Sequence, residues 1–377
     1  MVQDLAGRPG GPGGRRTARA LARLGAAMRG EERLELGRPP PAALRGRLGV
    51  APTARRARPL HLPPSRPPDE SSSTMKPIRV LMITSAEQKL NRYVGGWLRA
   101  RRQLDPTRYD LVHAQFGQSG LLALPKRLPL VVTFRGSDLL GIVSDVDGRY
   151  TWKGRVLQRL SRLVALNADA VIVVSEHMKR SLPPSVPAVV IPSGLDLELF
   201  RPMPRDAARH ALKLPLDRRY VLFVGNPAQA RKRHALARRA VEIVNHSCPV
   251  ELVTAWGAPH TDVPLYMNAC DALICTSSQE GSPNVVKEAL ACELPVVSVP
   301  VGDVPLRLRG IEGCEVCADD QPETLAAALD RVLRRGARIR SRGAVAELDE
   351  RSMAQQVIEI YRSVLNGAHH NHRGEDS

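Results

Sequence analysis

Apolar runs of strand length alternate with helical patterns along most of the chain. The runs show no polar alternation, which is typical of parallel strands covered on both faces. Strands that alternate with helices in this way predict an α/β fold. The strands are expected at residues 77–85, 109–115, 129–138 (with the loop that follows), 168–175, 187–194, 219–226, 249–257, 271–278 and 295–302.

The stretches between these runs have the spacing of amphipathic helices. Helices are expected at residues 91–104, 156–168, 176–182, 234–246, 262–270, 283–292, 322–335 and 353–367. The pattern is clear in the second of them. Its apolar residues are Val156, Leu157, Leu160, Leu163 and Val164.

The alternation is interrupted once, at residues 195–218, where turn residues and a short helix indicate a connection. The chain is therefore expected to form two doubly wound domains, with ligands beyond the carboxyl ends of the strands. The expected boundaries are 75–200 for the first domain, 201–348 for the second, 349–366 for a helix that packs back, and 367–377 for a disordered tail.

Residues 1–74 are rich in Arg, Pro and Gly and have too few apolar residues to form a core. We expect a disordered extension, or translated upstream sequence with the true start at Met75. An alternative is that the Arg-rich, helix-capable stretch 15–30 is similar to a transit peptide.

Charge and composition limit the partners. The formal net charge is +17, and residues 1–74 contribute 14 Arg against 6 acidic residues. Such a balance suits nucleotides, phosphates or an acidic lipid surface. Aromatic residues make up only 3% of the chain, so stacking surfaces for nucleic acid are not expected. No apolar run reaches the roughly 20 residues of a membrane-spanning helix.

The six cysteines all lie in the second half of the chain. Cys270, Cys275 and Cys292 have apolar neighbours and are expected to be buried thiols. Cys314 and Cys317 form a CxxC pair without a second pair or a nearby His, so no metal site is predicted. A reducing cytoplasm is the simpler expectation.

The stretch SSQEGSPNVVKEALACELPVVSVPVG, residues 277–302, follows a predicted strand and carries Glu280 and Glu288. Ser282 and Pro283 predict a helix start, with Ser as the N-cap and Pro as the first helical residue. Free N–H groups at such a start favour phosphate. Glu288 suits a ribose and Glu280 a hexose, because carboxylates accept hydrogen bonds from vicinal hydroxyls. The alternative is an ordinary capped helix with a surface charge.

A second anion site is predicted after the strand at 219–226. The sequence VLFVGNPAQARKR ends in a Gly-containing turn followed by Arg231, Lys232 and Arg233. Across the crevice these cations could meet a pyrophosphate. The alternative is a solvated helix start.

In this order on this fold, the two features resemble the family 4 glycosyltransferases, retaining enzymes of the GT-B fold. The resemblance covers about residues 76–366, and its specific part is the block 264–303. The family's second glutamate is followed by a small residue, Pro and two apolar residues, and here Leu294 replaces the usual Gly. More narrowly, within this family the chain resembles the branch that acts in bacterial polysaccharide and cell-envelope assembly.

The resemblance implies roles for individual residues. Glu288 would hold the donor ribose, Glu280 hydroxyls of the donor sugar, and Lys232 the diphosphate. Asn226 stands where the family usually has a diphosphate arginine, and Arg231 is the expected substitute. The expected catalytic residues are Glu280, Lys232 and Arg231. The expected donor-binding residues are Glu288, Gly281, Ser282, Pro283, Asn284, Val285, Gly225 and Asn226.

The first domain also matches the family, with departures. VIPSGLDLELFRP resembles the signature at the end of that domain, with Ser193 in place of Asn. His113, Arg135 and Asp138 are cleft candidates, and Arg135 replaces a family His. A structural hydrogen bond is the alternative role for His113.

The first domain is also expected to be shortened. Between Ser85 and Asn91, roughly 35–45 residues of an ordinary βαβ unit are missing relative to the family. This departure affects the acceptor side, because the family's acceptor site is shaped by the elements that follow its first strand.

The resemblance implies a retaining transfer from a nucleotide-diphosphate sugar to a glycan or lipid-linked acceptor, without a cofactor or metal. The expected location is the cytoplasm, with a basic face that suits peripheral attachment to an anionic membrane surface at the inner face. No nucleic-acid partner is expected. The alternative is a catalytically impaired, nucleotide-sugar-binding remnant with a shortened acceptor domain.

Overall fold

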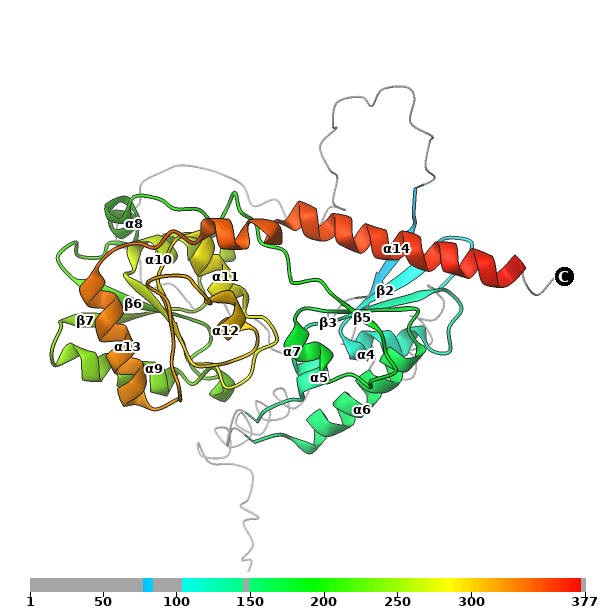
Figure 1. The fold of residues 1–377 in the computed structure, drawn as a ribbon, viewed down its shortest axis with the longest axis horizontal. Helices are drawn as coiled ribbons and strands as arrows, with labels where there is room; N and C mark the ends of the chain where they lie inside the picture. The colour runs from blue at the N-terminus through cyan, green and yellow to red at the C-terminus, as the bar shows by residue number, and fades with distance from the viewer. Residues whose placement is uncertain (1–76, 84–103, 145–148, 374–377) are drawn as a thin grey trace, which may run out of the picture. The chain divides into compact units, whose positions relative to one another are not determined.

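Two parallel five-stranded sheets form the framework of the protein, as seen in a computed structural model that describes residues 77–83, 104–144 and 149–373. The described residues belong to one compact unit, residues 75–377. The predicted α/β class with two parallel sheets is confirmed, and the second sheet has the strand-order reversal of a doubly wound sheet (Figure 1). The helix expected at 91–104 and the missing segment near Ser85 lie outside the described residues.

The first sheet has the order β1-β2-β3-β4-β5, and all pairs are parallel. Its strands are β1 (Val80–Ile83), β2 (Leu111–Gln115), β3 (Leu130–Phe134), β4 (Ala170–Val173) and β5 (Ala188–Val190). Its helices are α4 (Gly117–Gly120), η2 (Leu121–Ala123), α5 (Ser137–Leu140), α6 (Trp152–Asn167) and α7 (Glu176–Lys179).

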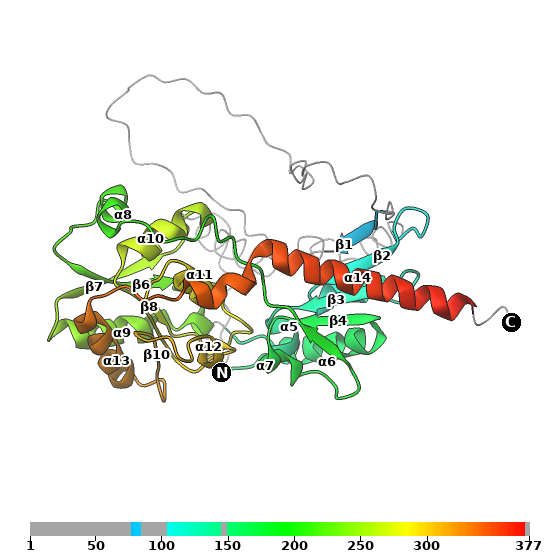
Figure 2. The same cartoon turned by 45° about the horizontal axis from the view of Figure 1, so that its top comes forward.

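Helices cover both faces of this sheet. α4, α5 and α6 lie on one face, and the long helix α14 (Glu350–Arg373) lies along the other (Figures 1 and 2). Met353, Val357 and Val364 of α14 pack against a cluster that contains Leu111 and Ile172. The C-terminal helix thus covers one face of the first sheet.

The second sheet has the order β10-β9-β8-β6-β7, again with all pairs parallel. Its strands are β6 (Arg219–Val224), β7 (Val250–Ala255), β8 (Ala272–Cys275), β9 (Val296–Ser298) and β10 (Glu315–Val316). Its helices are α8 (Arg205–Leu212), η3 (Ala230–Lys232), α9 (His234–Asn245), η4 (His260–Asp262), α10 (Val263–Ala269), α11 (Asn284–Ala291), α12 (Val304–Arg307), α13 (Pro322–Arg335) and η5 (Arg342–Leu348).

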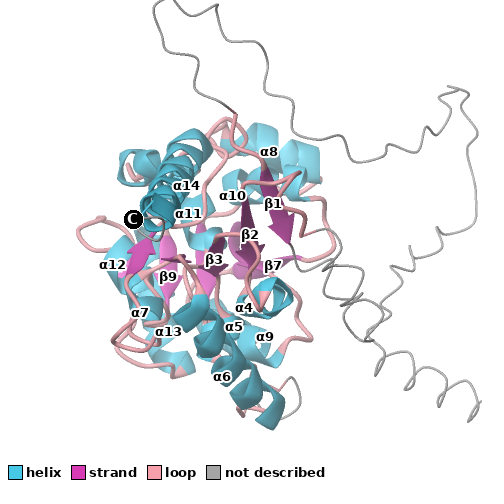
Figure 3. Ribbon diagram, turned by 90° about the vertical axis from the view of Figure 1, so that its right-hand side faces the viewer, coloured by secondary structure: helices cyan, strands magenta, loops and turns pink. Residues whose placement is uncertain are grey.

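Helices also cover both faces of the second sheet, as the colouring by secondary structure shows (Figure 3). Three of its strands, β6, β8 and β9, carry buried residues at nearly every position, which explains their unalternated sequences. The short strand β10 was not predicted, because only Glu315 and Val316 belong to it.

One helix does not bury the side that its pattern favours. In α6 the residues that are buried are small or moderate in size: Gly154, Ser161, Val164 and Ala165. Of the five predicted apolar residues, Val156, Leu160 and Leu163 are instead exposed. An amphipathic helix normally turns its apolar stripe to the core, so α6 departs from the usual arrangement.

Candidate functional site

The strand order of the second sheet reverses between β6 and β8, because β7 lies on one side of β6 and β8 on the other. In doubly wound sheets, such a reversal opens a crevice at the carboxyl ends of the strands. The loop after β6, residues 225–233, and the loop after β8, residues 276–283, both leave from this edge. The two sequence features that suggested a ligand site therefore lie at the topological switch point.

Hydrogen bonds hold these two loops together. The hydroxyl of Thr276 donates to the carbonyl oxygens of Lys232 at 2.8 Å and Arg233 at 3.1 Å. The backbone N–H of Ser278 donates to the carbonyl of Arg231 at 2.8 Å. The 3-10 turn that carries the cations is thus fixed against the strand end, so their side chains leave from a defined backbone.

Glu280, Arg231 and Lys232 meet at this edge. Oε1 of Glu280 accepts a hydrogen bond from Nζ of Lys232 at 2.6 Å and one from the Arg231 guanidinium at 3.0 Å. The side chains of Glu280 and Lys232 are mostly buried, whereas Arg231 remains about one-third exposed. The structure therefore brings together the three residues that the sequence predicted as catalytic.

Gly225 lies at the end of β6, beside Lys232. Its φ of 143° lies in the region that favours glycine. A Cβ there would sit 3.6 Å from Cδ and Cε of Lys232. Asn226 uses its side-chain oxygen locally, because Oδ1 accepts from the backbone N–H of Ala228 at 2.9 Å. Asn226 thus shapes the turn that carries the cations.

Glu288 lies in α11 and is almost completely buried. Burial raises its pKa, and a hydrogen bond of 3.2 Å between its Oε1 and Nε2 of His260 opposes that shift. His260 is mostly exposed and begins the short helix η4 after β7. Sequence reasoning missed His260, although its place after a neighbouring parallel strand could have suggested it.

The predicted cap of α11 is wrong. Pro283 is the N-cap residue, the helix begins at Asn284, and no side chain of the described residues caps it. The hydroxyl of Ser282 instead donates to Oδ2 of Asp303 at 2.8 Å. The Ser282 hydroxyl is thus hydrogen-bonded to Asp303, in the loop after β9, and does not cap α11. The backbone N–H groups of Asn284 and Val285 still lie in the first turn of α11, where the sequence predicted contacts with the donor.

Gly281 is where the loop after β8 approaches the first sheet. A Cβ at Gly281 would lie 2.6 Å from Sδ of Met178 and 2.8 Å from the carbonyl oxygen of Arg135. The hydroxyl of Ser175 donates to the carbonyl of Gly281 at 2.9 Å. Only a glycine permits this approach without displacement of backbone.

Arg135 extends from the end of β3 toward the same loop. Its Nε donates to Oε1 of Gln115 at 2.9 Å, and its guanidinium donates to Oγ of Ser193 at 3.0 Å. Burial lowers its pKa, and Asp138 opposes that shift. Arg135 lines a cavity of about 210 Å³ together with Arg231 and Glu280. The cleft prediction for Arg135 therefore agrees with its position beside the other candidates.

The other two cleft candidates, His113 and Asp138, are buried and engaged in hydrogen bonds within the first domain. His113 is buried and hydrogen-bonded to Tyr361 at 2.6 Å and Thr133 at 2.7 Å, which favours the alternative role given for it. Asp138 is fully buried and accepts from backbone N–H groups of the loop between β3 and α5, with Gly136 at 2.9 Å. Neither side chain is among the residues that line the cavity beside Glu280.

Lys287 is a further buried cation that sequence reasoning missed. It precedes Glu288 in α11, is almost completely buried, and donates from Nζ to the carbonyl of Ser193 at 3.3 Å. Burial lowers the pKa of Lys287 to about 8. Ser193, which replaces the family Asn, thus binds Lys287 through its carbonyl and Arg135 through its hydroxyl. Nothing in the local pattern VVKEAL marks this lysine as buried.

The cysteines behave as predicted from their neighbours. Cys270, Cys275 and Cys292 are buried, and no cysteine of the described residues is in a disulfide. Burial raises the pKa of Cys314 and of Cys317 to about 11. Among all the described residues, no group of three or more His, Cys, Asp or Glu side chains could hold a metal ion.

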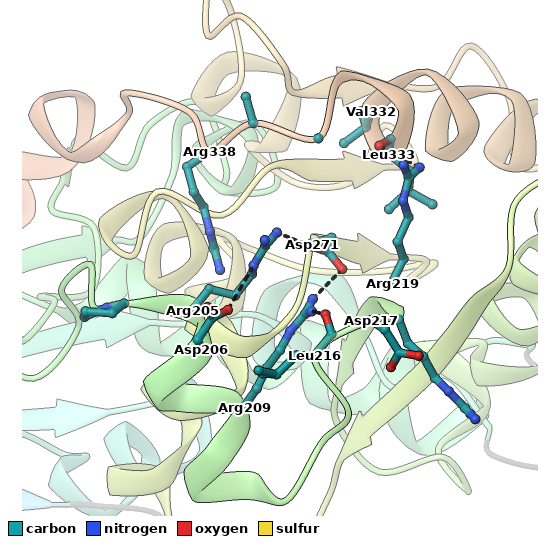
Figure 4. Close-up of a pocket in the computed structure, with 14 residues that line it drawn as sticks. Arg205, Asp206, Arg209, Leu216, Asp217, Arg219, Asp271, Val332, Leu333 and Arg338 are labelled. Carbon is teal, nitrogen blue, oxygen red and sulfur yellow. Dashed lines mark hydrogen bonds and ion pairs between the residues drawn. The ribbon is translucent and has the colours of Figure 1, made fainter.

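A larger, arginine-rich cavity of about 670 Å³ lies at the opposite, amino ends of the strands (Figure 4). Its centre is Asp271, which precedes β8 and accepts from Arg209 at 2.9 Å and Arg205 at 3.1 Å. Asp271 also accepts from the backbone N–H of Tyr220 at 2.7 Å. These charges are already paired, so we interpret the cluster as a structural link between α8 and the second sheet.

Two family models match the chain. The model described as Glycosyltransferase Family 4 matches residues 40–199, and the model described as Glycosyl transferases group 1 matches residues 220–335. The first match begins inside the Arg-rich segment, so the boundary predicted at residue 74 stays a prediction. Among the described residues, no helix has the length and apolar character that a membrane crossing requires.

Curated relatives include the D-inositol 3-phosphate glycosyltransferases of Mycobacterium tuberculosis and Mycobacterium bovis. Each is 31% identical over 289 residues, which cover 65% of this chain and 58% of the relative. The chain thus matches less than two thirds of the length of these relatives.

Solved structures show the same fold. Sucrose-phosphate synthase from Thermosynechococcus elongatus has a TM-score of 0.61 at 22% identity, covering 75% of this chain and 80% of that one. HepE from Anabaena in complex with UDP-glucose has a TM-score of 0.55 at 18% identity, covering 71% of this chain and 82% of that one. The two parallel sheets therefore form a GT-B-like fold.

Proposed function

Because the chain belongs to the glycosyltransferases of family 4 and group 1, we propose that it transfers a sugar with retention from a nucleotide-diphosphate sugar to a glycan or lipid-linked acceptor. The observation that carries this proposal is the meeting of Glu280, Arg231 and Lys232 at the switch point of the second sheet. We further propose that the acceptor belongs to polysaccharide or cell-envelope assembly.

The cations are placed to stabilise the leaving group. As the bond from the anomeric carbon to the phosphate oxygen breaks, the diphosphate gains negative charge. Lys232 and Arg231 would bind that charge more strongly in the transition state than in the ground state, which lowers the barrier. Glu280 holds both cations in place before the donor arrives and accepts hydrogen bonds from sugar hydroxyls once it is bound.

Glu288 is placed to hold the ribose of the donor. Its Oε1 is hydrogen-bonded to the exposed His260, so vicinal ribose hydroxyls would donate to Oε2. The N–H groups of Asn284 and Val285 at the start of the same helix would contact the diphosphate. The donor would therefore lie along α11, with its base toward η4 and its sugar toward Glu280.

The acceptor is proposed to enter beside Arg135. This cation lines the same 210 Å³ cavity as Arg231 and Glu280, at the end of β3 of the first sheet. A guanidinium there suits an acceptor with an anionic group. The curated relatives are named for D-inositol 3-phosphate, so inositol phosphates belong in the first acceptor panel together with glycans and lipid-linked sugars.

A binding experiment on ribose recognition tests the donor site. Calorimetry should show that the wild-type protein binds a ribonucleoside diphosphate about 10-fold or more tightly than its 2′-deoxy analogue, since hydrogen bonds to a carboxylate contribute about 1.5–3 kcal/mol. In Glu288→Gln this preference should fall to within about twofold. The control is Glu251→Gln, an exposed glutamate on β7 that pairs with Arg218. An unchanged preference in Glu288→Gln would contradict the assignment.

A transfer assay separates the enzyme from the second candidate, a catalytically impaired nucleotide-sugar-binding remnant. That candidate is favoured by the first sheet, because the strand order β1 to β5 never reverses in the described residues. A sheet without a reversal has no switch-point crevice of its own for the acceptor. Donor binding without transfer to any acceptor and without donor hydrolysis would support the remnant.

A further inference from the structure

The small residues of helix α6 pack against helix α4 of the first domain. A Cβ at Gly117 of α4 would lie 2.7 Å from Cβ of Ser161, and one at Gly120 would lie 2.4 Å from Cγ1 of Val164. Glycines therefore let α4 pack closely against the Gly154 and Ser161 side of α6. This close packing determines which side of α6 faces the protein.

The consequence is that the large apolar side chains of α6 face outward. Trp152, Val156, Leu160, Leu163 and Leu166 are all exposed. Their spacing of four, four, three and three residues places them on one side of the helix. We call these five residues the α6 stripe. An exposed apolar stripe of this length usually marks an interaction site.

Within α6 itself, the charged side chains are all positive. Lys153, Arg155, Arg159 and Arg162 are exposed, and the 16 residues of the helix include no Asp or Glu. By the helical period, Arg155 and Arg162 follow one border of the stripe and Lys153 the other, while Arg159 lies just inside the first border. An apolar stripe bordered by Lys and Arg, with Trp at one end, is the pattern of a helix that lies in a membrane interface.

We propose that α6 docks the protein on an anionic lipid surface. The stripe would enter the boundary between headgroups and acyl chains, and the bordering cations would contact anionic headgroups. A second copy of this chain fits less well, because two α6 faces would bring like charges together without acidic partners. The proposal goes beyond sugar transfer and needs no bound donor, so it can fail or hold independently of the proposed function.

Vesicle binding tests the surface. The full-length protein should co-sediment with vesicles of equal parts phosphatidylglycerol and phosphatidylcholine, and bind far less to phosphatidylcholine alone. The triple variant Arg155→Gln, Arg159→Gln, Arg162→Gln should bind about 100-fold more weakly, since each cation near an anionic surface contributes about 1 kcal/mol. Arg238→Gln with Arg239→Gln, on exposed residues of α9, is the charge control.

The apolar half of the test has closely matched controls. Trp152 is 71% exposed and Leu163 49%, while Trp256 is 59% and Leu306 57% exposed in the second domain. Trp152→Ser with Leu163→Ser should reduce vesicle binding about 10-fold or more, whereas Trp256→Ser with Leu306→Ser should not. A blue shift of tryptophan emission on adding vesicles should persist in Trp256→Phe and disappear in Trp152→Phe.

Three results would overturn the proposal. The first is absence of binding to anionic vesicles. The second is equal binding by all variants, which would attribute it to the Arg-rich residues 1–74. The third is a wild-type dimer in sedimentation velocity that Trp152→Ser with Leu163→Ser dissociates, because the stripe would then be covered by a second copy. Circular dichroism should show that each variant is folded.

Discussion

His113 and Tyr361 are 248 residues apart in sequence, and their side chains share a hydrogen bond of 2.6 Å. Nε2 of His113 lies 3.3 Å from Nε2 of Gln115, an amide donor, so this imidazole nitrogen is an acceptor. Nδ1 of His113 therefore carries the proton and donates to the Tyr361 hydroxyl. Because Arg135 donates to Gln115, a chain of hydrogen bonds connects the candidate site to helix α14.

This arrangement predicts a loss of stability in mild acid. Burial, with a smaller effect of Arg135, lowers the pKa of His113 from 6.5 to about 4. Between these values the unfolded chain binds a proton that the folded protein excludes. Stability from this group is thus complete above pH 6.5 and is lost as pH falls toward 4, by up to about 3 kcal/mol.

Urea unfolding at pH 7, 5.5 and 4.5 measures this loss. His113→Gln should flatten the acid slope relative to the wild type, even if it lowers stability at pH 7. His177→Gln, at an exposed position in α7, is the control and should keep the wild-type slope. Equal slopes for all three proteins would refute the assignment.

Replacing Glu280 should strengthen binding of the diphosphate and slow transfer of the sugar. Glu280→Gln removes the negative charge that neutralises Lys232 and Arg231, so a nucleoside diphosphate should bind about fivefold more tightly. Transfer or donor hydrolysis should fall about 100-fold, because the sugar is no longer oriented. Calorimetry and steady-state rates measure the two effects. Glu315→Gln, which loses a pair with Arg331 outside the site, should change neither.

Gly302 should be irreplaceable because of its neighbours. Its φ of 55° already favours glycine, and a Cβ would lie 2.8 Å from the carbonyl oxygen of Glu280 and 2.9 Å from that of Gly281. Both are backbone atoms, so no flexible side chain can give way. Gly302→Ala should lower the free energy of unfolding by about 1–3 kcal/mol and weaken donor binding.

The comparison for this variant is Gly310→Ala. Gly310 has a φ of 76° and nothing within 4 Å of the added Cβ, so it measures the conformational cost alone. Chemical denaturation of both variants should show the larger loss for Gly302→Ala. Equal losses would mean that the contact with the loop of Glu280 contributes nothing.

The sequence was sufficient to predict that Glu280, Arg231 and Lys232 would come together. Each follows a buried strand, and the carboxyl ends of neighbouring parallel strands share an edge. The cap of α11 was not predictable in the same way. Ser282 had the local signature of an N-cap, but Asp303 from a separate loop competes for its hydroxyl. Such a competition depends on tertiary contacts that a local pattern does not contain.

The orientation of α6 was hidden for a related reason. Periodicity identified the apolar residues Val156, Leu160 and Leu163, but which side is buried depends on the glycines of α4. The burial of Lys287 likewise depends on a distant residue, because its ammonium group donates to the carbonyl of Ser193 in the other domain. Sequence patterns predict elements and strand-end sites well, and they do not predict which faces meet.

The arginine cluster at the amino ends of the second sheet should be important for stability. Asp271 pairs with Arg209, whose guanidinium is almost completely buried and also donates to the carbonyls of Ala269 and Leu216. Asp271→Ala leaves this charge buried without its counterion, so the free energy of unfolding should fall by about 3–5 kcal/mol. Guanidinium chloride denaturation measures this difference.

An exposed ion pair of the same sheet provides the control for Asp271. Glu251 of β7 pairs with Arg218, and both side chains are at least half exposed. Glu251→Ala should lower the free energy of unfolding far less than Asp271→Ala, because water screens the pair and solvates the arginine that remains. If Asp271→Ala were as mild as Glu251→Ala, Arg209 would have to find another acceptor or reach solvent. A rescue by Arg209→Met in the Asp271→Ala background would instead show that the unpaired buried charge causes the loss.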